Sequence, residues 1–280
     1  IFDNSGSGLP YLIGRKPSIQ SEALNIMQSW GLHIYGGCLQ GKGATTGALL
    51  DLGATYNSSA HDLNLINAQD GILYKFCLMS TIRNCMSNGI RNKSFSLNIG
   101  DWSGSTNSNS QSNHSLIEQC RVFNYGGALS AFEVRGSSGC MIRQCISEGQ
   151  KPQYHIFWDA LGSTVVKDAR IEGVHVESIA TVSGIYMNLS NGYAVLDGVY
   201  AQYAQKLFDI KGAGYPHVYI KNIPWLPGGS TFNNVGTNVV WSFNECNFDV
   251  NDVNIWSGST KPYYYSQEGY NQSKYINYNS

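Results

Sequence analysis

Three carboxylate residues lie in strand-like segments of similar pattern, and their spacing could support acid–base chemistry. Glu133, Asp159 and Asp209 occur in the stretches SAFEVRG (130–136), HIFWDALG (155–162) and KLFDIKG (206–212). Apolar and polar residues alternate in each stretch, so the carboxylate lies on the face opposite the apolar side chains. Two carboxyl groups about 5–9.5 Å apart can hydrolyse a glycosidic bond. We therefore predict that these three residues are catalytic, with Glu133 and Asp159 as the first pair; the alternative is that they are ordinary solvated charges.

The same face carries residue types that could hold a polysaccharide. Flat aromatic rings can stack on sugar rings, and cationic side chains bind acidic sugar groups. The predicted substrate-binding residues are Asp101, Trp102, Arg135, His155, Phe157, Tyr186, Asn188 and Lys211. His155 could also act as the base of a β-elimination, in which Arg135 or Lys211 would neutralise a uronic carboxylate. Trp158 falls at an inward position and is expected in the core.

A four-residue unit with apolar or small ends and a polar pair between them recurs along the chain. It is clearest as IRNC (82–85), IEQC (117–120) and IRQC (142–145). Further copies are predicted at 60–63, 166–169, 195–198, 220–223 and 243–246, with a weaker start at Leu32. Neighbouring copies end between 22 residues (Leu63 to Cys85) and 35 residues (Cys85 to Cys120) apart. A steady minimum with irregular extensions indicates coils of fixed circumference that carry loops of variable length.

These coils predict an all-β fold, a right-handed single-stranded parallel β-helix of about nine coils. A short strand offers one or two inward positions before a corner, and like residues of successive coils stack about 4.8 Å apart. One coil cannot bury its apolar face alone, so several must stack. The segment 18–29 could form a short helix, but we favour a first strand at 24–28.

The predicted organisation has three parts. A lead-in occupies 1–23, the β-helix domain 24–250, and an irregular Tyr/Asn-rich segment 251–280. The last segment loses the repeat and is expected to cap the final coil, to pack on a partner chain or to be disordered. A low-complexity stretch at 101–114 widens one coil, and long loops of this kind are commonly functional or mobile.

Composition limits the kinds of partner. Among 280 residues, Lys+Arg 18 stand against Asp+Glu 19, so the chain lacks the basic surface of a nucleic-acid-binding protein. No apolar run approaches the ~20 residues of a membrane helix, and we expect no membrane insertion. The Cys count of 7, without a C-x-x-C pair, fits neither a disulfide framework nor a zinc site. We expect the cysteines to be small buried hydrophobes, and we expect no metal and no cofactor.

With its coils, the chain resembles the pectate-lyase-like superfamily of right-handed parallel β-helices, and within it the phage tailspike and capsule-depolymerase proteins. The resemblance rests on LNIMQSWGLHIYGGCLQGKG (24–43), on GALLDLGATYNSSAHDLNLINAQDGI (47–72) and on the IRNC, IEQC and IRQC units, and it spans 24–249. It implies a homotrimer on a virion tail that recognises a bacterial surface polysaccharide. Many such proteins also cleave that glycan.

The resemblance and the carboxylates together predict a tailspike-like protein that binds a capsule or O-antigen and depolymerises it by glycoside hydrolysis. Three alternatives stay open. The protein could be a polysaccharide lyase that acts by β-elimination, a non-catalytic glycan-binding tail fibre, or a secreted microbial enzyme.

Overall fold

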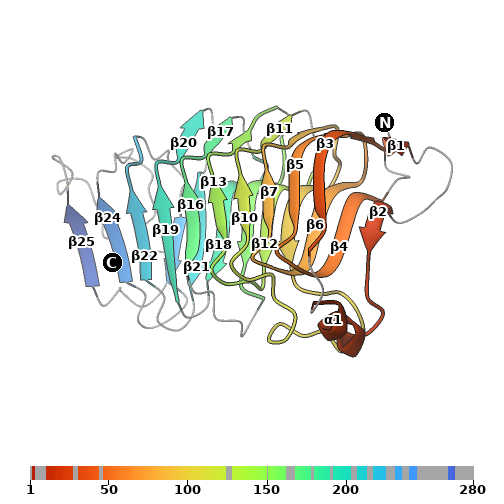
Figure 1. The fold of residues 1–280 in the computed structure, drawn as a ribbon. Helices are drawn as coiled ribbons and strands as arrows, with labels where there is room; N and C mark the ends of the chain where they lie inside the picture. The colour runs from red at the N-terminus through yellow and green to blue at the C-terminus, as the bar shows by residue number, and fades with distance from the viewer. Residues whose placement is uncertain are drawn as a thin grey trace.

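The polypeptide winds into a stack of coils, and the strands of successive coils lie side by side (Figure 1). The computed structural model describes residues 2–3, 11–27, 31–43, 47–123, 128–149, 151–161, 168–177, 180–189, 192–202, 207–212, 217–224, 231–234, 240–244 and 264–268. Within these residues every strand pair of the two sheets is parallel, as expected when each coil returns to the level above its own start.

The 16-stranded sheet, here the first sheet, supplies two sides of each coil. Its strands are β1 (Phe2–Asp3), β3 (His33–Gln40), β5 (Ser59–Ile66), β7 (Thr81–Arg83), β8 (Met86–Asn88), β10 (Leu116–Glu118), β11 (Arg121–Phe123), β13 (Met141–Arg143), β14 (Ile146–Ser147), β16 (Ala169–Glu172), β17 (His175–Glu177), β19 (Tyr193–Asp197), β20 (Tyr200–Gln202), β22 (His217–Lys221), β24 (Val240–Asn244) and β25 (Tyr264–Glu268).

The 9-stranded sheet, here the second sheet, closes the coil on the remaining side. Its strands, in spatial order, are β2 (Tyr11–Arg15), β4 (Ala48–Tyr56), β6 (Asp70–Leu78), β9 (Lys93–Asn98), β12 (Ser130–Arg135), β15 (Tyr154–Asp159), β18 (Ser183–Leu189), β21 (Phe208–Gly212) and β23 (Thr231–Asn234). Their order in space is their order in the sequence, which is the arrangement that stacked coils require.

The expected fold class is confirmed: the chain is an all-β parallel β-helix of about 7 turns. The expected count of nine assigned one coil to each copy of the repeat. The copies near both ends belong to turns that the described residues do not complete. Strands β1 and β2, within the expected lead-in, pair with β3 and β4, and β25, within the expected irregular segment, pairs with β24.

A left-handed backbone residue at one corner explains the four-residue unit. Its third position has a φ between +48° and +62° in seven successive coils, at Asp62, Asn84, Gln119, Gln144, Gly173, Gly198 and Asn222. Asparagine and glycine tolerate this conformation better than most residues do. From Asn84 to Gly198 the backbone N–H of the corner residue donates to the next coil, as from Asn84 to the carbonyl of Glu118 at 3.0 Å.

This corner corrects the predicted register of three copies. Ile171 pairs with Ile142, and Leu196 pairs with Ile171, so the true copies are 171–174 and 196–199 rather than 166–169 and 195–198. Near the start of the chain, Ile34 pairs with Ala60, so that copy begins two residues after Leu32. In the copies 171–174 and 196–199 the third residue is glycine, Gly173 and Gly198, instead of a polar residue. These two copies therefore lack the polar pair by which the repeat was recognised.

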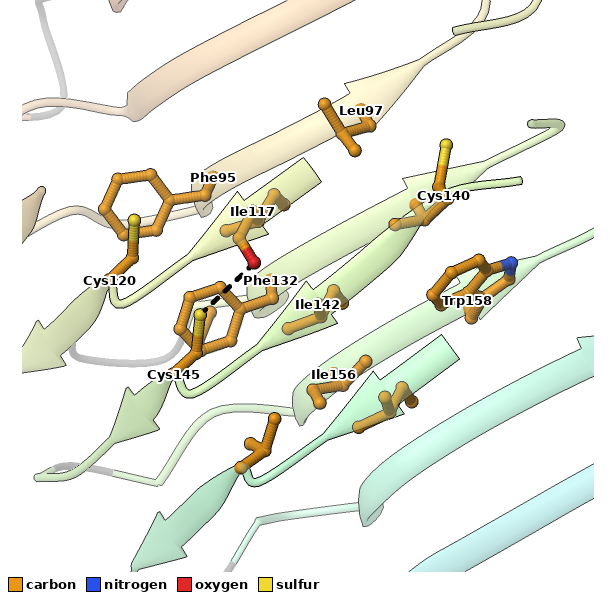
Figure 2. Packing of buried hydrophobic residues seen from close by; sticks show 14 of the residues in the cluster. Phe95, Leu97, Ile117, Cys120, Phe132, Cys140, Ile142, Cys145, Ile156 and Trp158 are labelled. Carbon is orange, nitrogen blue, oxygen red and sulfur yellow. Dashed lines mark hydrogen bonds between the residues drawn. The ribbon is translucent and has the colours of Figure 1, made fainter. Parts of the chain in front are cut away.

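The interior is a stack of like residues from successive coils. Figure 2 shows Phe95 above Phe132, with ring centroids 5.8 Å apart, and Cys120 above Cys145. The Cys145 thiol donates to the Ile117 carbonyl of the preceding coil at 3.6 Å. Each thiol therefore adds a weak bond between coils while it fills the space at the corner.

The described cysteines confirm the expectation of small buried hydrophobes. Cys77, Cys85, Cys120, Cys140 and Cys145 are buried free thiols, and Cys38 is a half-buried one. Burial raises the pKa of Cys77 and of Cys140 to about 12, which keeps both thiols protonated at neutral pH. Cys246 lies outside the described residues.

A short helix replaces the strand expected at 24–28. Helix α1 (Gln20–Met27) lies outside the coils, near β4 (Figure 1). The Glu22 carboxylate accepts a 2.7 Å hydrogen bond from the Ser18 backbone N–H, which stabilises the first turn. Ala23 is buried against Ala54, Phe76 and Trp102, so the helix is held to the coils by its apolar face. Within the described residues no helix combines the length and apolar character needed to cross a membrane.

The corner makes a testable prediction at Gly173, which has a φ of +58°. A Cβ at this position would meet only the Cγ atom of Gln144, at 3.7 Å, so space is not limiting. We expect Gly173→Val to lower the free energy of unfolding by about 1–2 kcal/mol, because a β-branched residue is strained there. Gly173→Asn should lower it by less than about 0.5 kcal/mol. Equal urea midpoints for the two variants would contradict the corner rule.

Candidate functional site

The outer face of the second sheet gathers most of the predicted site residues into two adjacent rows. Strands β12, β15, β18 and β21 place Glu133, Phe157, Tyr186 and Asp209 in one row. The same strands place Arg135, Asp159, Asn188 and Lys211 in the next row. Side chains of the intervening positions point inward and are buried, as the alternation predicted. The catalytic and binding roles of these residues stay predictions.

Three aromatic rings form a platform on this face. The Phe157 and Tyr186 rings are stacked at 5.0 Å between centroids, with an interplanar angle of 7°. The Tyr154 ring lies 5.1 Å from Phe157 and 5.4 Å from Tyr186. We call Tyr154, Phe157 and Tyr186 the aromatic platform. All three side chains are half-buried, so each keeps part of its surface open to solvent.

Two cations flank the platform. The Arg135 guanidinium lies 6.0 Å from the Phe157 ring centroid, and the Lys211 ammonium lies 5.3 Å from that of Tyr186. Cation–π attraction at such distances holds the charges beside the rings. The surface therefore combines flat apolar area with positive charge at both ends.

Asp159 is held in place by neighbouring donors. Its Oδ1 atom accepts hydrogen bonds of 3.1 Å from the Asn188 side-chain amide and of 3.1 Å from the Leu161 backbone N–H. Its Oδ2 atom lies 3.9 Å from the Arg135 guanidinium. These contacts fix the orientation of the Asp159 side chain.

Glu133 points to the outer face as predicted, but its side chain is 0% exposed. The Oε1 atom accepts from the Ser96 hydroxyl at 2.9 Å and from the Asn98 amide at 3.2 Å, and it lies 3.0 Å from the Lys93 ammonium. The Oε2 atom is also buried and has no hydrogen-bond partner among the described residues. A buried oxygen without a partner costs free energy unless another group satisfies it.

The three predicted catalytic residues lie at unequal distances from one another in the second sheet. Glu133 and Asp159 lie on neighbouring strands and two positions apart, so their Cα atoms are about 8 Å apart. The Glu133 carboxyl is bound to β9 and Asp159 Oδ1 is bound to Asn188 of β18, so the two side chains reach toward opposite neighbouring strands. Asp209 lies three strands from Glu133, about 14 Å away, which is too far for it to pair with Glu133.

His155 and Trp102 do not lie where the sequence placed them. His155 is 0% exposed and shares a 2.7 Å hydrogen bond with the Ser147 hydroxyl. The regular alternation begins only at Ile156, so His155 turns inward and Tyr154 turns outward. Trp102 is 7% exposed, because its ring packs on Phe76 and its indole N–H donates to Gln20.

Asp101 lies in a separate ionic cluster two strands away from β12. Its Oδ2 atom lies 3.1 Å from the Lys16 ammonium and 3.0 Å from the Lys75 ammonium, and Lys75 also lies 2.8 Å from Asp51. Burial alone would raise the pKa of Asp101, but the bonds from Lys75 and Lys16 outweigh burial and lower it. Asp101 therefore joins the loop 101–114 to the second sheet.

Tyr154 is the platform residue that the sequence reasoning left out of the site. If side chains alternated strictly along β15, Tyr154 would point inward, like Ile156 and Trp158. The alternation breaks at His155, which points inward instead, and Tyr154 therefore points outward. Its proximity to His155 in the sequence gave no signal of its own. The occurrence of two aromatic residues, Tyr154 and Phe157, in one predicted strand was the signal in the sequence that could have placed Tyr154 in the site.

Comparisons with known proteins found no match: no family model, no curated protein and no solved structure matches this chain. The assignment to a parallel β-helix therefore rests on the structure itself.

The platform tyrosines make a prediction about ionisation. Burial raises the pKa of Tyr154 and of Tyr186, and the negative charge of Asp209 raises both further. A negative neighbour disfavours tyrosinate, so Asp209→Asn should lower both pKa values. Asp197→Asn, on the first sheet, should leave them unchanged. The measurement is an NMR titration of the tyrosine Cζ signals; unchanged values in Asp209→Asn would disprove the contact.

The buried carboxylate makes a prediction about stability. Lys93→Met removes the cation next to the fully buried Glu133 and should lower the free energy of unfolding by about 3–5 kcal/mol. Lys16→Met removes an exposed partner of Asp101 at a similar distance and should cost about 0–1 kcal/mol. Urea unfolding of both variants checks this. Similar losses would show that Glu133 does not depend on Lys93.

Proposed function

We propose that the protein recognises a bacterial surface polysaccharide on the outer face of the second sheet and hydrolyses it there with Glu133 and Asp159. The observation that carries the proposal is the aromatic platform, which lies beside two cations and the Asp159 carboxylate on the outer face of the second sheet. Capsule and O-antigen chains are the substrates that this proposal names.

Binding is supported by the chemistry of the platform. The apolar faces of sugar rings can lie on the Phe157 and Tyr186 rings, which present a flat surface in van der Waals reach. Arg135 and Lys211 can bind carboxylate groups of an acidic sugar, and the Asn188 amide can bind hydroxyls. Successive sugars could then follow the row of strands along the axis of the β-helix.

Hydrolysis is supported by the placement of two carboxyl residues on the neighbouring strands β12 and β15. In this mechanism Asp159, whose Oδ1 atom accepts two hydrogen bonds and whose Oδ2 atom lies 3.9 Å from Arg135, takes a proton from water as the water attacks the anomeric carbon. For this step Glu133 must first take up a proton, because the group that pairs with Lys93 is the carboxylate. It then gives that proton from Oε2 to the leaving oxygen, so the glycosidic bond breaks as the new C–O bond forms. The reaction inverts the anomeric configuration. Lys93 covers Glu133 and must move aside for this step.

A second candidate is a binding protein without catalysis, and the burial of Glu133 favours it. An acid that the substrate cannot reach would leave the platform as a glycan-binding surface alone. The lyase alternative has lost support, since His155, its predicted base, points into the core.

The same proposal includes assembly and location. A homotrimer on a virion tail is what the resemblance to tailspikes implies, and a secreted enzyme is its alternative. Both rest on the sequence resemblance and on the β-helix fold, with which they are compatible.

The deciding experiment incubates the protein with capsules and O-antigens from a panel of bacteria. New reducing ends in the products indicate hydrolysis, and unsaturated ends, seen by ultraviolet absorbance, indicate β-elimination. Retained binding without products would identify the non-catalytic protein. Neither binding nor products from any polysaccharide would reject the proposal as a whole.

The proposal predicts that two kinds of variant behave differently on a polysaccharide that is cleaved. Phe157→Ala should weaken binding about tenfold, equivalent to about 1.4 kcal/mol, because it removes a stacking ring. Asp159→Asn and Glu133→Gln should abolish product release while binding stays within about threefold. Tyr219→Ala, an exposed ring on the first sheet, is the control and should change neither. Full activity of Asp159→Asn would exclude the carboxylate pair.

A further inference from the structure

The buried thiols of three successive coils form a column at the corner of the first sheet. Cys85, Cys120 and Cys145 each hold the last position of the four-residue unit, and Figure 2 shows Cys120 above Cys145. The Cys120 thiol makes a hydrogen bond with the Cys85 sulfur, and it reaches the Ile82 carbonyl, in the coil of Cys85, at 3.6 Å. Neighbouring coils are about 4.8 Å apart, within the Cα separation of about 4.4–6.8 Å that a disulfide spans. The two thiols are therefore placed so that a disulfide could join their coils.

A hollow of about 310 Å³ on the surface of the first sheet has Cys85 in its lining. Cys85 is 1% exposed, whereas Cys120 and Cys145 are 0% exposed and do not line the hollow. Cys85 thus lies at the boundary between the hollow and the column of thiols. The hollow has room for several molecules of about 30 Å³, the volume of one molecule in liquid water. A small solute can therefore come close to Cys85 while the chain stays folded.

The polar groups around this hollow are paired with one another. The Asn84 amide donates to Asp62 Oδ1 at 2.5 Å, and the Gln119 amide donates to Gln144 Oε1 at 3.3 Å. Asp62 and Arg121, which both line the hollow, carry opposite charges, so the hollow does not select an ion of either sign. These features suit the passage of a small neutral molecule better than the recognition of a large or charged one.

The two thiols differ in ionisation, and this difference gives each a separate chemical role. The hydrogen bond with the Cys120 thiol is the largest effect on Cys85 and lowers its pKa, although burial and the Asp62 carboxylate act to raise it. Burial raises the pKa of Cys120 well above its usual range. The thiolate is the reactive form of cysteine, so Cys85 is the residue that an oxidant attacks first. Cys120 keeps its proton until it reacts with the oxidised Cys85.

We propose that Cys85 and Cys120 form a redox pair that hydrogen peroxide oxidises through the hollow. The Cys85 thiolate attacks one peroxide oxygen, the O–O bond breaks, and the hydroxide that leaves takes up a proton to become water. Cys85 is then a sulfenic acid. The Cys120 sulfur attacks the Cys85 sulfur and displaces the hydroxyl group, which leaves as water with the proton of Cys120. Two thiols are oxidised to one disulfide, and one peroxide is reduced to two water molecules.

The disulfide would join two coils that are 35 residues apart in the sequence (120 − 85), across the loop 101–114. A dithiol reductant would open it again. The pair shares no residue with the aromatic platform, so the inference stands whether or not the platform hydrolyses a glycan.

The test treats the folded full chain with hydrogen peroxide, blocks the remaining thiols with N-ethylmaleimide in denaturant, and maps the peptides by mass spectrometry. A cross-linked pair of peptides containing Cys85 and Cys120 should appear, lighter by two hydrogen atoms than the reduced peptides, and dithiothreitol should separate them. Cys85 should be consumed at least about tenfold faster than Cys140, because burial raises the pKa of Cys140 to about 12 and Cys140 does not line the hollow. In Cys120→Ser the sulfenic acid should persist on Cys85, where dimedone traps it.

Cys140→Ser is the matched control and should keep the cross-link. Free Cys85 and Cys120 thiols in the peroxide-treated natural chain would overturn the inference, and this result does not depend on the folding of any variant. A bond between Cys120 and Cys145 that leaves Cys85 free would also overturn it. Oxidation of Cys77 and Cys140 as fast as that of Cys85 would reject the hollow as the route and the pair with it.

Discussion

The vertical register of successive coils is the constraint on which the rest of the structure depends. Parallel strands about 4.8 Å apart share their backbone hydrogen bonds only if each coil returns to the same place. The left-handed corner residue secures that return, because it turns the chain at a fixed point and donates its N–H to the next coil. A shift by one residue would move every inward side chain to the outside. The loops can vary in length because they connect the strands outside the paired segments and do not alter the register.

The same register brings together residues that are far apart in the sequence. Phe157 and Tyr186 stack because β15 and β18 pair residue by residue, although the two residues are 29 positions apart along the chain (186 − 157). Each row of the outer face therefore contains one residue from each coil. A binding surface can be built or changed by substituting one outward residue at a time, without any change in the core.

Much of this architecture could be predicted from the sequence, because the pattern in the strands is local. The alternation in SAFEVRG predicts that Phe132 is inside and that Glu133 points outward, and both are confirmed. Contacts between elements could not be predicted in the same way. Glu133 is buried by Lys93 from another coil, and Trp102 by a helix and by Phe76. His155 points inward although strict alternation from Ile156 would point it outward. It lies near the start of β15, where one irregular residue is enough to reverse the order of inward and outward side chains.

Charge pairing in a stacked sheet needs no functional explanation, and neither does the stacking of one pair of rings. Like charges placed one above another would repel, so stacked rows tend to alternate in sign. The first sheet does so at Arg83, Glu118 and Arg143, which pair across three coils. Arg135 and Asp159 on the second sheet could be stabilised for the same reason. Stacked rings on neighbouring strands gain a comparable amount, roughly 0.2–1 kcal/mol for each cross-strand pair. The fold does not require, however, that three such rings lie half-exposed between two cations on one face. The proposed binding role rests on this grouping, and the carboxylates beside it acquire a role only through what the platform holds.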